Sequence, residues 1–231
     1  NTMPLLDSKG HLLEAGWARK PFWKYQRNDI QVPWYRIKEW DYYYVLSDDL
    51  RRGISFTISD LGYASLLAVC WIDFESKKSY QQDCLIPFTR GTLGLDEDSQ
   101  SSEVIQKTKN LTIKYQVNMG IRSIAFSAPN LVIGAAKGIS GEFELHHSEE
   151  NDSLNIASSW KQKPVAFYYN RKVNLMQPQG FVQINKQRFE FDSKNCLAGL
   201  DWGRGSWTYK NRWFWASANG VVNGELFGLN L

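Results

Sequence analysis

Apolar and polar residues alternate with a period of two along much of this chain. The clearest runs cover residues 54–58, 66–74, 111–117 and 139–145. A period of two puts every second side chain on the same face of a strand, so these runs predict half-buried antiparallel strands. No stretch has an apolar stripe of helical period and length, and no internal repeat is present. The chain is therefore predicted to be all-β.

Turn-forming residues separate the predicted strands at the spacing of hairpins and meanders. Asp48-Asp49, Asn185-Lys186 and Asn219-Gly220 are examples, and the last predicts a hairpin within residues 207–231. The polar and acidic stretch 94–109 is predicted to be a flexible loop. Because open strand edges invite aggregation, we expect two packed sheets or a closed barrel, and an antiparallel calycin-type barrel or sandwich fits this pattern.

Composition indicates a folded globular protein rather than a disordered or nucleic-acid-binding one. Hydrophobic residues make up 43% of the 231 residues and charged residues 22%. The net charge of +3 is small and the Lys and Arg residues are scattered, so no nucleic-acid partner is expected. Aromatic residues reach 14%, with 10 Trp, which suits pleated surfaces or ligand-lined cavities.

Several classes of site and location are excluded at this level. Three cysteines without a CxxC pair favour a reducing compartment, and no apolar run is long enough for a membrane span. With no signal-peptide pattern at the start, a cytoplasmic location is expected. The few histidines include the adjacent His146 and His147, which point oppositely on a regular strand, so no metal site is expected. No nucleotide fingerprint is present, and no cofactor is expected.

The most distinctive segment is the aromatic, glycine-rich run over residues 200–231, which contains Asp201 and Arg204. Alternation would put these two on opposite faces of a strand. Gly203 between them can adopt a positive φ, and a bulge there would turn both side chains inward. One interpretation is a structural ion pair. The other is a preorganised catalytic acid, with Arg204 orienting it or an anionic ligand group.

Asp60 is a second candidate acid. It continues the face of Ile54, Phe56 and Ile58 by one further step of two, so its carboxyl group is expected at the end of an inward-facing row. Burial there would raise its pKa and make it a proton donor. The alternative is an Asx-turn that accepts backbone N–H groups at the strand end.

Aromatic and basic residues near these acids are candidates for ligand binding. Alternation places Lys38, Trp40 and Tyr42 on one face of a strand and Asp41 on the other. For any one of the aromatic residues, the alternative is ordinary cross-strand packing. For Arg90, which precedes Gly91 in a loop, the alternative is a solvated side chain without a ligand. The full set of ligand-binding candidates is Lys38, Trp40, Asp41, Tyr42, Tyr63, Arg90, Trp207, Trp213 and Trp215.

The run over residues 200–231 resembles the signature of the uncharacterised bacterial family called domain of unknown function 2804. Residues 12–21, 38–43, 58–63, 87–91 and 191–197 also match motifs of that family. The family is distantly similar to lipocalin-like proteins that include carotenoid hydratases and the AttH group, which are built from two barrel-like β domains.

This resemblance implies one lipocalin-like β unit over residues 1–231, with an internal division near 148–160. Family members continue past the segment where this chain stops, so we expect a truncated two-barrel protein with one complete barrel and part of a second. An open strand edge at its C-terminus would be covered by a second copy, which predicts a homo-oligomer.

Three functions follow from these candidates. The first is binding of a hydrophobic or amphipathic small molecule in an aromatic pocket, with acid-catalysed hydratase or cyclase chemistry by Asp201 or Asp60 implied by the related hydratases. The second is carbohydrate binding or cleavage by two carboxylates among Asp41, Asp60 and Asp201. The third is a structural or interaction protein whose aromatic residues are core. A pocket with one carboxylate and apolar walls favours the first, and two facing carboxylates favour the second.

Overall fold

The computed structural model describes residues 2–118, 120–148 and 150–231. They form strands joined by turns, with two short 3-10 helices, η1 (Arg27–Asp29) and η2 (Trp34–Arg36). The strands are β1 (Met3–Pro4), β2 (Gly16–Ala18), β3 (Trp23–Lys24), β4 (Ile37–Ser47), β5 (Arg52–Asp60), β6 (Ala64–Asp73), β7 (Lys78–Pro87), β8 (Ser102–Lys107), β9 (Thr112–Asn118), β10 (Ile121–Ile133), β11 (Ala136–His146), β12 (Leu154–Trp160), β13 (Lys163–Ile184), β14 (Gln187–Phe191), β15 (Cys196–Ser206), β16 (Ser217–Val222) and β17 (Glu225–Asn230).

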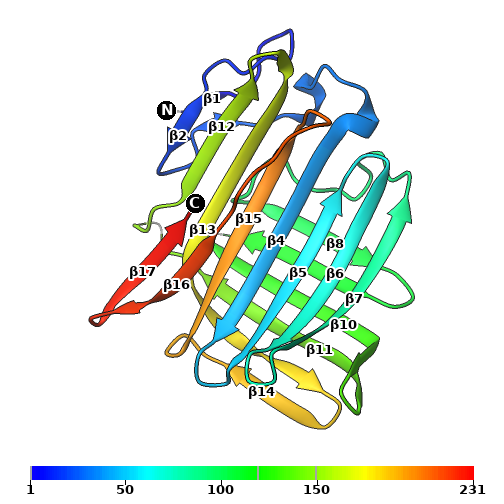
Figure 1. Cartoon of the computed structure of the whole chain (residues 1–231), viewed down its shortest axis with the longest axis vertical. Coiled ribbons are helices and arrows are strands. Elements are labelled where there is room, and N and C mark those ends of the chain that lie inside the picture. The colour runs from blue at the N-terminus through cyan, green and yellow to red at the C-terminus, as the bar shows by residue number, and fades with distance from the viewer. Residues whose placement is uncertain (1, 119, 149) are drawn as a thin grey trace.

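Thirteen strands form one large sheet, and ten of them follow the order β7-β6-β5-β4-β15-β13-β11-β10-β9-β8 (Figure 1). In addition, β12 and β14 pair with β13, and β2 pairs with β12. Every pair within this sheet is antiparallel, and the two-residue pair of β1 with β3 is parallel. The predicted all-β, antiparallel class is therefore confirmed, as a curled half-barrel sheet. No helix of the described residues is long and apolar enough to cross a membrane.

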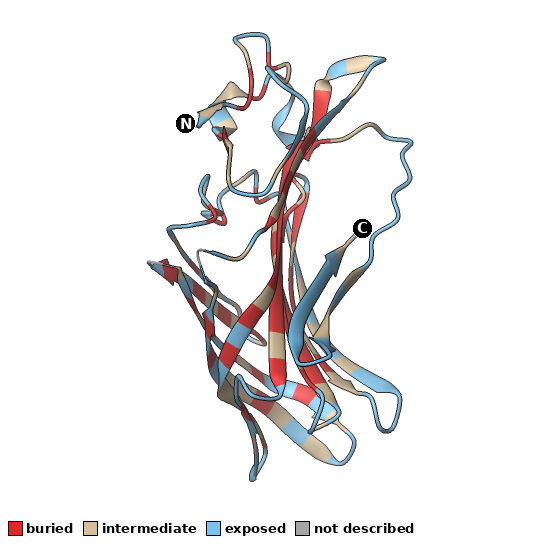
Figure 2. Cartoon of the chain, turned by 90° about the vertical axis from the view of Figure 1, so that its left-hand side faces the viewer, coloured by how far each residue is buried: buried red, intermediate tan, exposed pale blue. Residues whose placement is uncertain are grey.

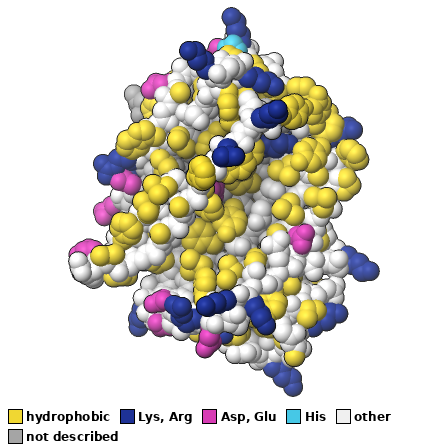
Figure 3. All heavy atoms as spheres, viewed as in Figure 1, with side chains coloured by type: hydrophobic (Ala, Val, Ile, Leu, Met, Phe, Trp, Pro, Cys, Tyr) yellow, Lys and Arg dark blue, Asp and Glu magenta, His cyan; other side chains and the backbone are white. Residues whose placement is uncertain are grey.

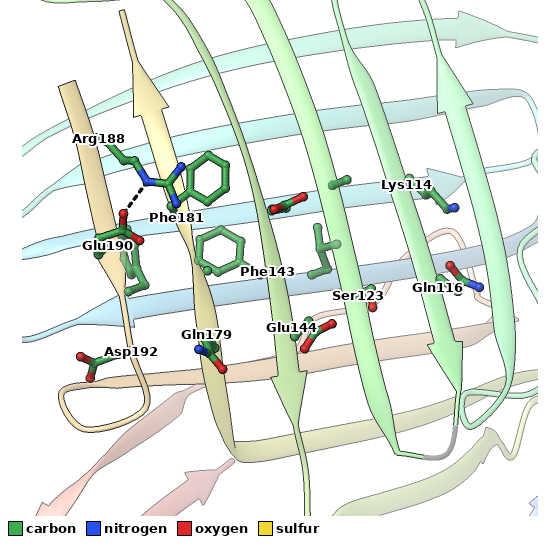
Figure 4. Close-up of a pocket in the computed structure, with 15 residues that line it drawn as sticks. Lys114, Gln116, Ser123, Phe143, Glu144, Gln179, Phe181, Arg188, Glu190 and Asp192 are labelled. Carbon is green, nitrogen blue, oxygen red and sulfur yellow. Dashed lines mark hydrogen bonds and ion pairs between the residues drawn. The ribbon is translucent and has the colours of Figure 1, made fainter. Parts of the chain in front are cut away.

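The long strand β13 belongs to two layers and makes the sheet fold over itself. Its first half pairs with β12 and β15, and its second half pairs with β11 and β14. Between the halves the register with β15 shifts from Val173 to Met176, and Leu175 has a φ of 61°. Such an irregularity bends a strand. The strands of the second layer, β8 to β11, consequently cross behind those of the first (Figures 1 and 4).

The main core lies between the two layers. Ile54, Phe56 and Ile58 are completely buried, which confirms the alternation predicted for β5. The ring of Phe56 lies 4.9 Å from that of Phe126 on β10 and 6.0 Å from that of Phe143 on β11. Burial of a Phe or Ile side chain stabilises a fold by roughly 1.5–3 kcal/mol, so these cross-layer contacts hold the layers together.

We call the face of the first layer that is turned toward the second layer the inner face, and the opposite one the outer face. The segment 207–231, which carries β16 and β17, lies on the outer side (Figure 2). Its side chains are mostly exposed, while those of the strands beneath it are mostly buried. This segment therefore covers part of the outer face.

Two local predictions are wrong. The stretch 94–109 is not wholly a loop, because β8 lies within it and pairs with β9, with Val104 on the buried side. The C-terminal hairpin exists, but its turn is Asn223-Gly224, where both residues have positive φ. Asn219 instead stays in β16, since its side chain accepts a hydrogen bond from the Leu175 backbone N–H at 2.8 Å.

Candidate functional site

The segment 207–231 and the outer face enclose a cavity of about 460 Å³, which we call the tryptophan cavity. Hydrophobic side chains gather over this part of the molecule (Figure 3). The cavity is lined mainly by aromatic and aliphatic side chains, with few charged groups. Its lining residues are Trp40, Leu154, Ile156, Ser158, Trp160, Tyr168, Lys172, Asp201, Trp207, Asn211, Arg212, Trp213, Phe214, Trp215 and Leu231.

A buried ion pair forms the polar part of the lining. The Asp201 carboxylate accepts hydrogen bonds at one oxygen from Trp40 Nε1 at 2.9 Å and from Asn170 Nδ2 at 2.6 Å. Its other oxygen accepts a hydrogen bond from Lys172 Nζ. The side chains of Lys172 and Asp201 are only 8% and 12% exposed. The carboxylate is therefore compensated inside an apolar cavity, as a buried charge must be.

Strand register explains why these groups meet. Asp201 lies opposite Tyr42 of β4 on one side and opposite Lys172 of β13 on the other. Directly opposed residues of neighbouring strands point to the same face. The pair therefore projects outward from the centre of the first layer.

The aromatic lining is a connected group of rings. Trp40 is stacked with Tyr168 at 6.1 Å between ring centroids and meets Trp207 edge-on at 5.3 Å. Trp207 in turn lies 5.2 Å from Trp213. The Lys172 ammonium lies 4.8 Å from the ring centroid of Trp215, a cation–π contact that adds to its ion pair.

Gly203 makes room for the Trp40 indole. A Cβ atom at Gly203 would lie 1.9 Å from Cζ2 of Trp40, so any larger residue would displace the ring. Gly203 does not have a positive φ. Its function is thus the close approach of an indole to the backbone, not the bulge that the sequence predicted.

Burial shifts the pKa of two residues in the lining. It lowers the pKa of Lys172, although the Asp201 carboxylate beside it acts in the opposite direction. The pKa of the Tyr168 phenol is raised well above its ordinary value, first by burial and then by Asp201. The Tyr168 side chain is therefore a neutral phenol, not a phenolate.

The prediction that Asp201 and Arg204 point to the same side is wrong. β15 pairs with β4 without a register shift from Cys196 to Ser206, so strict alternation holds. Arg204 therefore lies on the inner face, where it is fully buried. Its Nη1 donates to Asp41 Oδ1 at 2.9 Å, and its Nη2 to the Asp96 carbonyl at 2.7 Å.

Arg204 therefore forms a buried ion pair with Asp41, not with Asp201 as the sequence suggested. The neighbouring Glu39 accepts a hydrogen bond from the Tyr25 hydroxyl at 2.7 Å and another from Arg27. Burial raises the pKa of Asp41, while Arg204 opposes that rise. These contacts tie the N-terminal segment to the first layer, which is a structural role.

Asp60 also lies on the inner face and away from the tryptophan cavity. It is 1% exposed and accepts the Gly62 and Gly91 backbone N–H groups, each at 2.7 Å. The bond from Gly62 forms the Asx-turn that the sequence offered as the alternative to a catalytic acid. The bond from Gly91 also ties Asp60 to the loop after β7. The expected convergence of Asp60 and Arg204 on one cavity with Asp201 is therefore wrong.

The remaining candidates are divided between the cavity and its surroundings. Trp40, Trp207, Trp213 and Trp215 line the tryptophan cavity with Asp201, as the sequence predicted. Tyr42 lies behind Trp215, with ring centroids 6.1 Å apart, and does not line it.

Three further candidates lie outside the cavity. Lys38 contacts the Leu61 carbonyl, and its ammonium lies 4.4 Å from the ring centroid of the exposed Tyr63. Arg90 is exposed and lies over the Trp34 ring at 4.8 Å. These three are surface contacts, not parts of a shared pocket.

Sequence reasoning missed Lys172, Asn170 and Tyr168. All three lie on the outer face of β13, two residues apart from one another. Residues 168–172 show no alternation of apolar and polar side chains, so no local signal assigned them to a face. A buried Asp201 requires a positive partner, but the sequence does not show which lysine or arginine that partner is.

A second hollow of about 550 Å³ lies on the exposed face of the second layer (Figure 4). Charged and amide side chains such as Lys114, Glu144 and Gln179 stand around it. The ion pair of Arg188 with Glu190 is at its edge, and the Arg188 guanidinium stacks on Phe181 at 3.5 Å. This is a solvated sheet surface with no buried charged group. Within the described ranges, no cluster of three or more His, Cys, Asp or Glu residues could hold a metal ion.

The fold and the site define an all-β protein with a folded-over antiparallel sheet and an aromatic cavity on its outer face. Residues 1–231 match the family described as Domain of unknown function (DUF2804), so the chain belongs to that family. This confirms the resemblance seen in the sequence. No curated protein matches the chain significantly in sequence.

Three solved structures show distant similarity. A candidate AttH from Nitrosomonas europaea has 14% identity over 80% of this chain and 54% of its own, with a TM-score of 0.49. CghA with Sch210972 has 11% identity over 74% and 46%, with a TM-score of 0.47. Kievitone hydratase from Nectria haematococca has 7% identity over 74% and 89%, with a TM-score of 0.24. The chain spans about half the length of the first two structures.

Proposed function

We propose that the tryptophan cavity binds a hydrophobic or amphipathic small molecule, with the Asp201–Lys172 pair as its polar anchor. The observation that carries this proposal is a cavity of about 460 Å³ with aromatic and aliphatic walls around one compensated ion pair. Sites for small molecules are mostly apolar concavities with a few placed polar groups, and this volume is in their usual range of roughly 300–1,000 Å³.

Pocket polarity favours this proposal over carbohydrate cleavage. Among the described residues that line the cavity, Asp201 is the one with a side-chain carboxylate. The other two acids considered, Asp41 and Asp60, lie on the inner face with their own partners. Cleavage by two carboxylates needs both on one substrate, at separations of roughly 5–9.5 Å across the scissile bond.

The hydratase or cyclase chemistry implied by the family resemblance remains a proposal. In it, Asp201 would give the proton to a double bond, and the Trp40 and Trp215 rings would stabilise the developing cation. Both Asp201 oxygens accept hydrogen bonds, so the proton would have to arrive through Lys172. Binding without chemistry needs no such transfer and is the function we favour.

Three wider expectations from the sequence also remain proposals. The first is a single β unit with an internal division near residues 148–160. The second is self-association through an open C-terminal strand edge. The third is a cytoplasmic location, which agrees with the free thiols of Cys70, Cys84 and Cys196.

Binding of the neutral fluorescent probe N-phenyl-1-naphthylamine tests the proposed function. We expect the wild-type protein to enhance its emission, and Trp213→Ser to weaken its affinity by about tenfold, the equivalent of one lost aromatic contact. Trp213 is 65% exposed, so its loss leaves the core intact.

Trp34→Ser is the matched control, because Trp34 is also a partly exposed tryptophan but contacts Tyr35 and Arg90 outside the cavity. It should bind the probe as the wild-type protein does. Equal affinities for all three proteins, or no enhancement by the wild-type protein, would contradict the proposal.

A further inference from the structure

Two arginines meet inside the molecule without a carboxylate partner. Arg122 on β10 of the second layer is 2% exposed, and Arg171 on β13 of the first layer is 6% exposed. Neither guanidinium has a carboxylate oxygen within 4.0 Å among the described residues, whereas the equally buried Arg204 is paired with Asp41. Arginine stays protonated in proteins, so this pair carries two positive charges in the core.

The hydrogen bonds of the pair are incomplete, although the Tyr43 side chain forms one with Arg122. Ser99, on the loop before β8, accepts from Arg122 Nη2 at its carbonyl at 3.0 Å and from Arg171 Nη1 at its hydroxyl at 2.9 Å. One neutral residue thus bridges two like charges. The Nε atoms of both arginines are buried and have no hydrogen-bond partner in the described part of the chain.

Tyr115 adds another unsatisfied donor from the neighbouring strand. Its hydroxyl is buried without a described partner, and its side chain is 1% exposed. In the pairing of β9 with β10, Arg122 lies opposite Val117, so Tyr115 is its diagonal neighbour on the same face. Diagonal neighbours are within reach of long side chains. Unsatisfied buried donors of this kind indicate a missing acceptor.

A cavity adjoins the pair. It has a volume of about 330 Å³, and its lining includes Gly120 and His147. The Gly120 carbonyl accepts a hydrogen bond from Arg122 Nη1 at 3.5 Å. Burial, then the charges of Arg122 and Arg171, lowers the pKa of His147 to about 4, so the imidazole is neutral beside them. Arg122, Arg171 and Tyr115 do not themselves line this cavity, but the contacts of Gly120 and His147 place it next to the two arginines.

We infer that Arg122 and Arg171 form an oxyanion-binding site for a phosphate or carboxylate group, which would enter from the side of the molecule where His147 and the neighbouring cavity lie. Guanidinium groups match the geometry of both anions, and a bound anion supplies the acceptors that the two Nε–H groups and the Tyr115 hydroxyl lack. It also adds negative charge beside two buried arginines whose interactions with carboxylates, Asp41 for Arg122 and Asp98 for Arg171, act from beyond 4.0 Å. The site is independent of the tryptophan cavity, since its groups lie between the two layers.

Calorimetric titration with inorganic phosphate and, separately, with acetate at constant ionic strength tests this inference. We expect the wild-type protein to bind at least one of the two anions, and the arm that responds identifies the group. Arg171→Met should weaken binding by at least about tenfold, because it removes a charged hydrogen-bond donor. Arg188→Met, which removes an exposed arginine paired with Glu190, should bind as the wild-type protein does.

Tyr115→Phe is the second variant, because it removes one hydroxyl that has no described partner and leaves the packing in place. We expect it to fold normally and to bind the anion several-fold more weakly. If neither anion binds the wild-type protein, or if Tyr115→Phe and Arg171→Met bind phosphate and acetate as tightly as the wild-type protein, the inference is wrong.

Discussion

Asp201 and Lys172 illustrate how a buried ion pair depends on both of its members. Asp201→Asn would leave the Lys172 ammonium buried without its counter-charge. Loss of one partner of a buried pair costs about 3–5 kcal/mol, and we expect a decrease of about 3 kcal/mol in the free energy of unfolding, measured by urea denaturation. The double variant Asp201→Asn with Lys172→Met should recover most of that loss, because no unpaired charge remains.

Ligand binding by the same Asp201→Asn protein shows whether the Asp201–Lys172 pair only stabilises the fold or also anchors a ligand. A lost anchor should weaken binding of the fluorescent probe, or of an amphipathic competitor, beyond the effect on stability. If stability falls and both affinities are unchanged, the pair is structural only. A variant as stable as the wild-type protein would show that Lys172 is not buried as described.

His147 makes stability depend on pH. Its pKa is about 4 in the folded protein, below the ordinary value of 6.5, so the unfolded chain binds more protons between these values. Stability from this group is therefore complete above about pH 6.5 and is lost as the pH falls toward 4. Between pH 7 and pH 5 in phosphate-free buffer, the wild-type protein should lose about 1 kcal/mol more than His147→Gln, after allowance for solvent screening of a half-buried ring.

Thermal and urea unfolding of the two proteins at both pH values measures this difference. The comparison with His147→Gln removes the contributions of other titrating groups, such as the buried Glu39 and Asp41, which are common to both. Parallel stability curves for the two proteins would contradict a depressed pKa of His147.

Strand β15 contributes residues to both faces of the first layer: Asp201 and Gly203 to the outer face and Arg204 to the inner face. Gly203→Ala should lower the free energy of unfolding by about 1–3 kcal/mol, the usual cost of overpacking, because the new methyl group would displace the Trp40 ring. It should also weaken probe binding, since Trp40 lines the tryptophan cavity. Urea unfolding and probe titration measure the two effects.

Gly220→Ala on β16 is the control for this element. A Cβ atom at Gly220 meets no atom within 4 Å, so the substitution should change stability by less than about 0.5 kcal/mol. Similar losses for both glycine variants would indicate a general backbone effect instead of the contact with Trp40.

The sequence predicted the buried sides of the strands better than the position of the C-terminal turn. Strict alternation located the buried side of β5 and β9 correctly, because the strand period of two is a local property. Asn219-Gly220 and Asn223-Gly224 are equally good turn sequences. The second forms the turn because Asn219 is held in β16 by the Leu175 backbone N–H and the Tyr44 hydroxyl, contacts from distant strands.

At the scale of the whole molecule, the folding of the sheet over itself creates two separate environments. The inner side holds Arg204, Asp41 and Asp60 in structural contacts, and the outer side holds Asp201 beneath the C-terminal segment. A ligand in the tryptophan cavity and an anion between the layers would thus be separated by the first layer. The two proposed sites can be tested independently for that reason.

The sequence by itself determined the all-β class, the family and the sidedness of most strands. It also identified Asp201 and four tryptophans that meet in one cavity, since these depend on local period and on a distinctive C-terminal run. The tertiary structure decided that Arg204 pairs with Asp41, and that Lys172 is the counter-charge of Asp201. It also brought Arg122 and Arg171 together. Pairing register and layer packing join residues far apart in the chain, and no local pattern encodes which of them will meet.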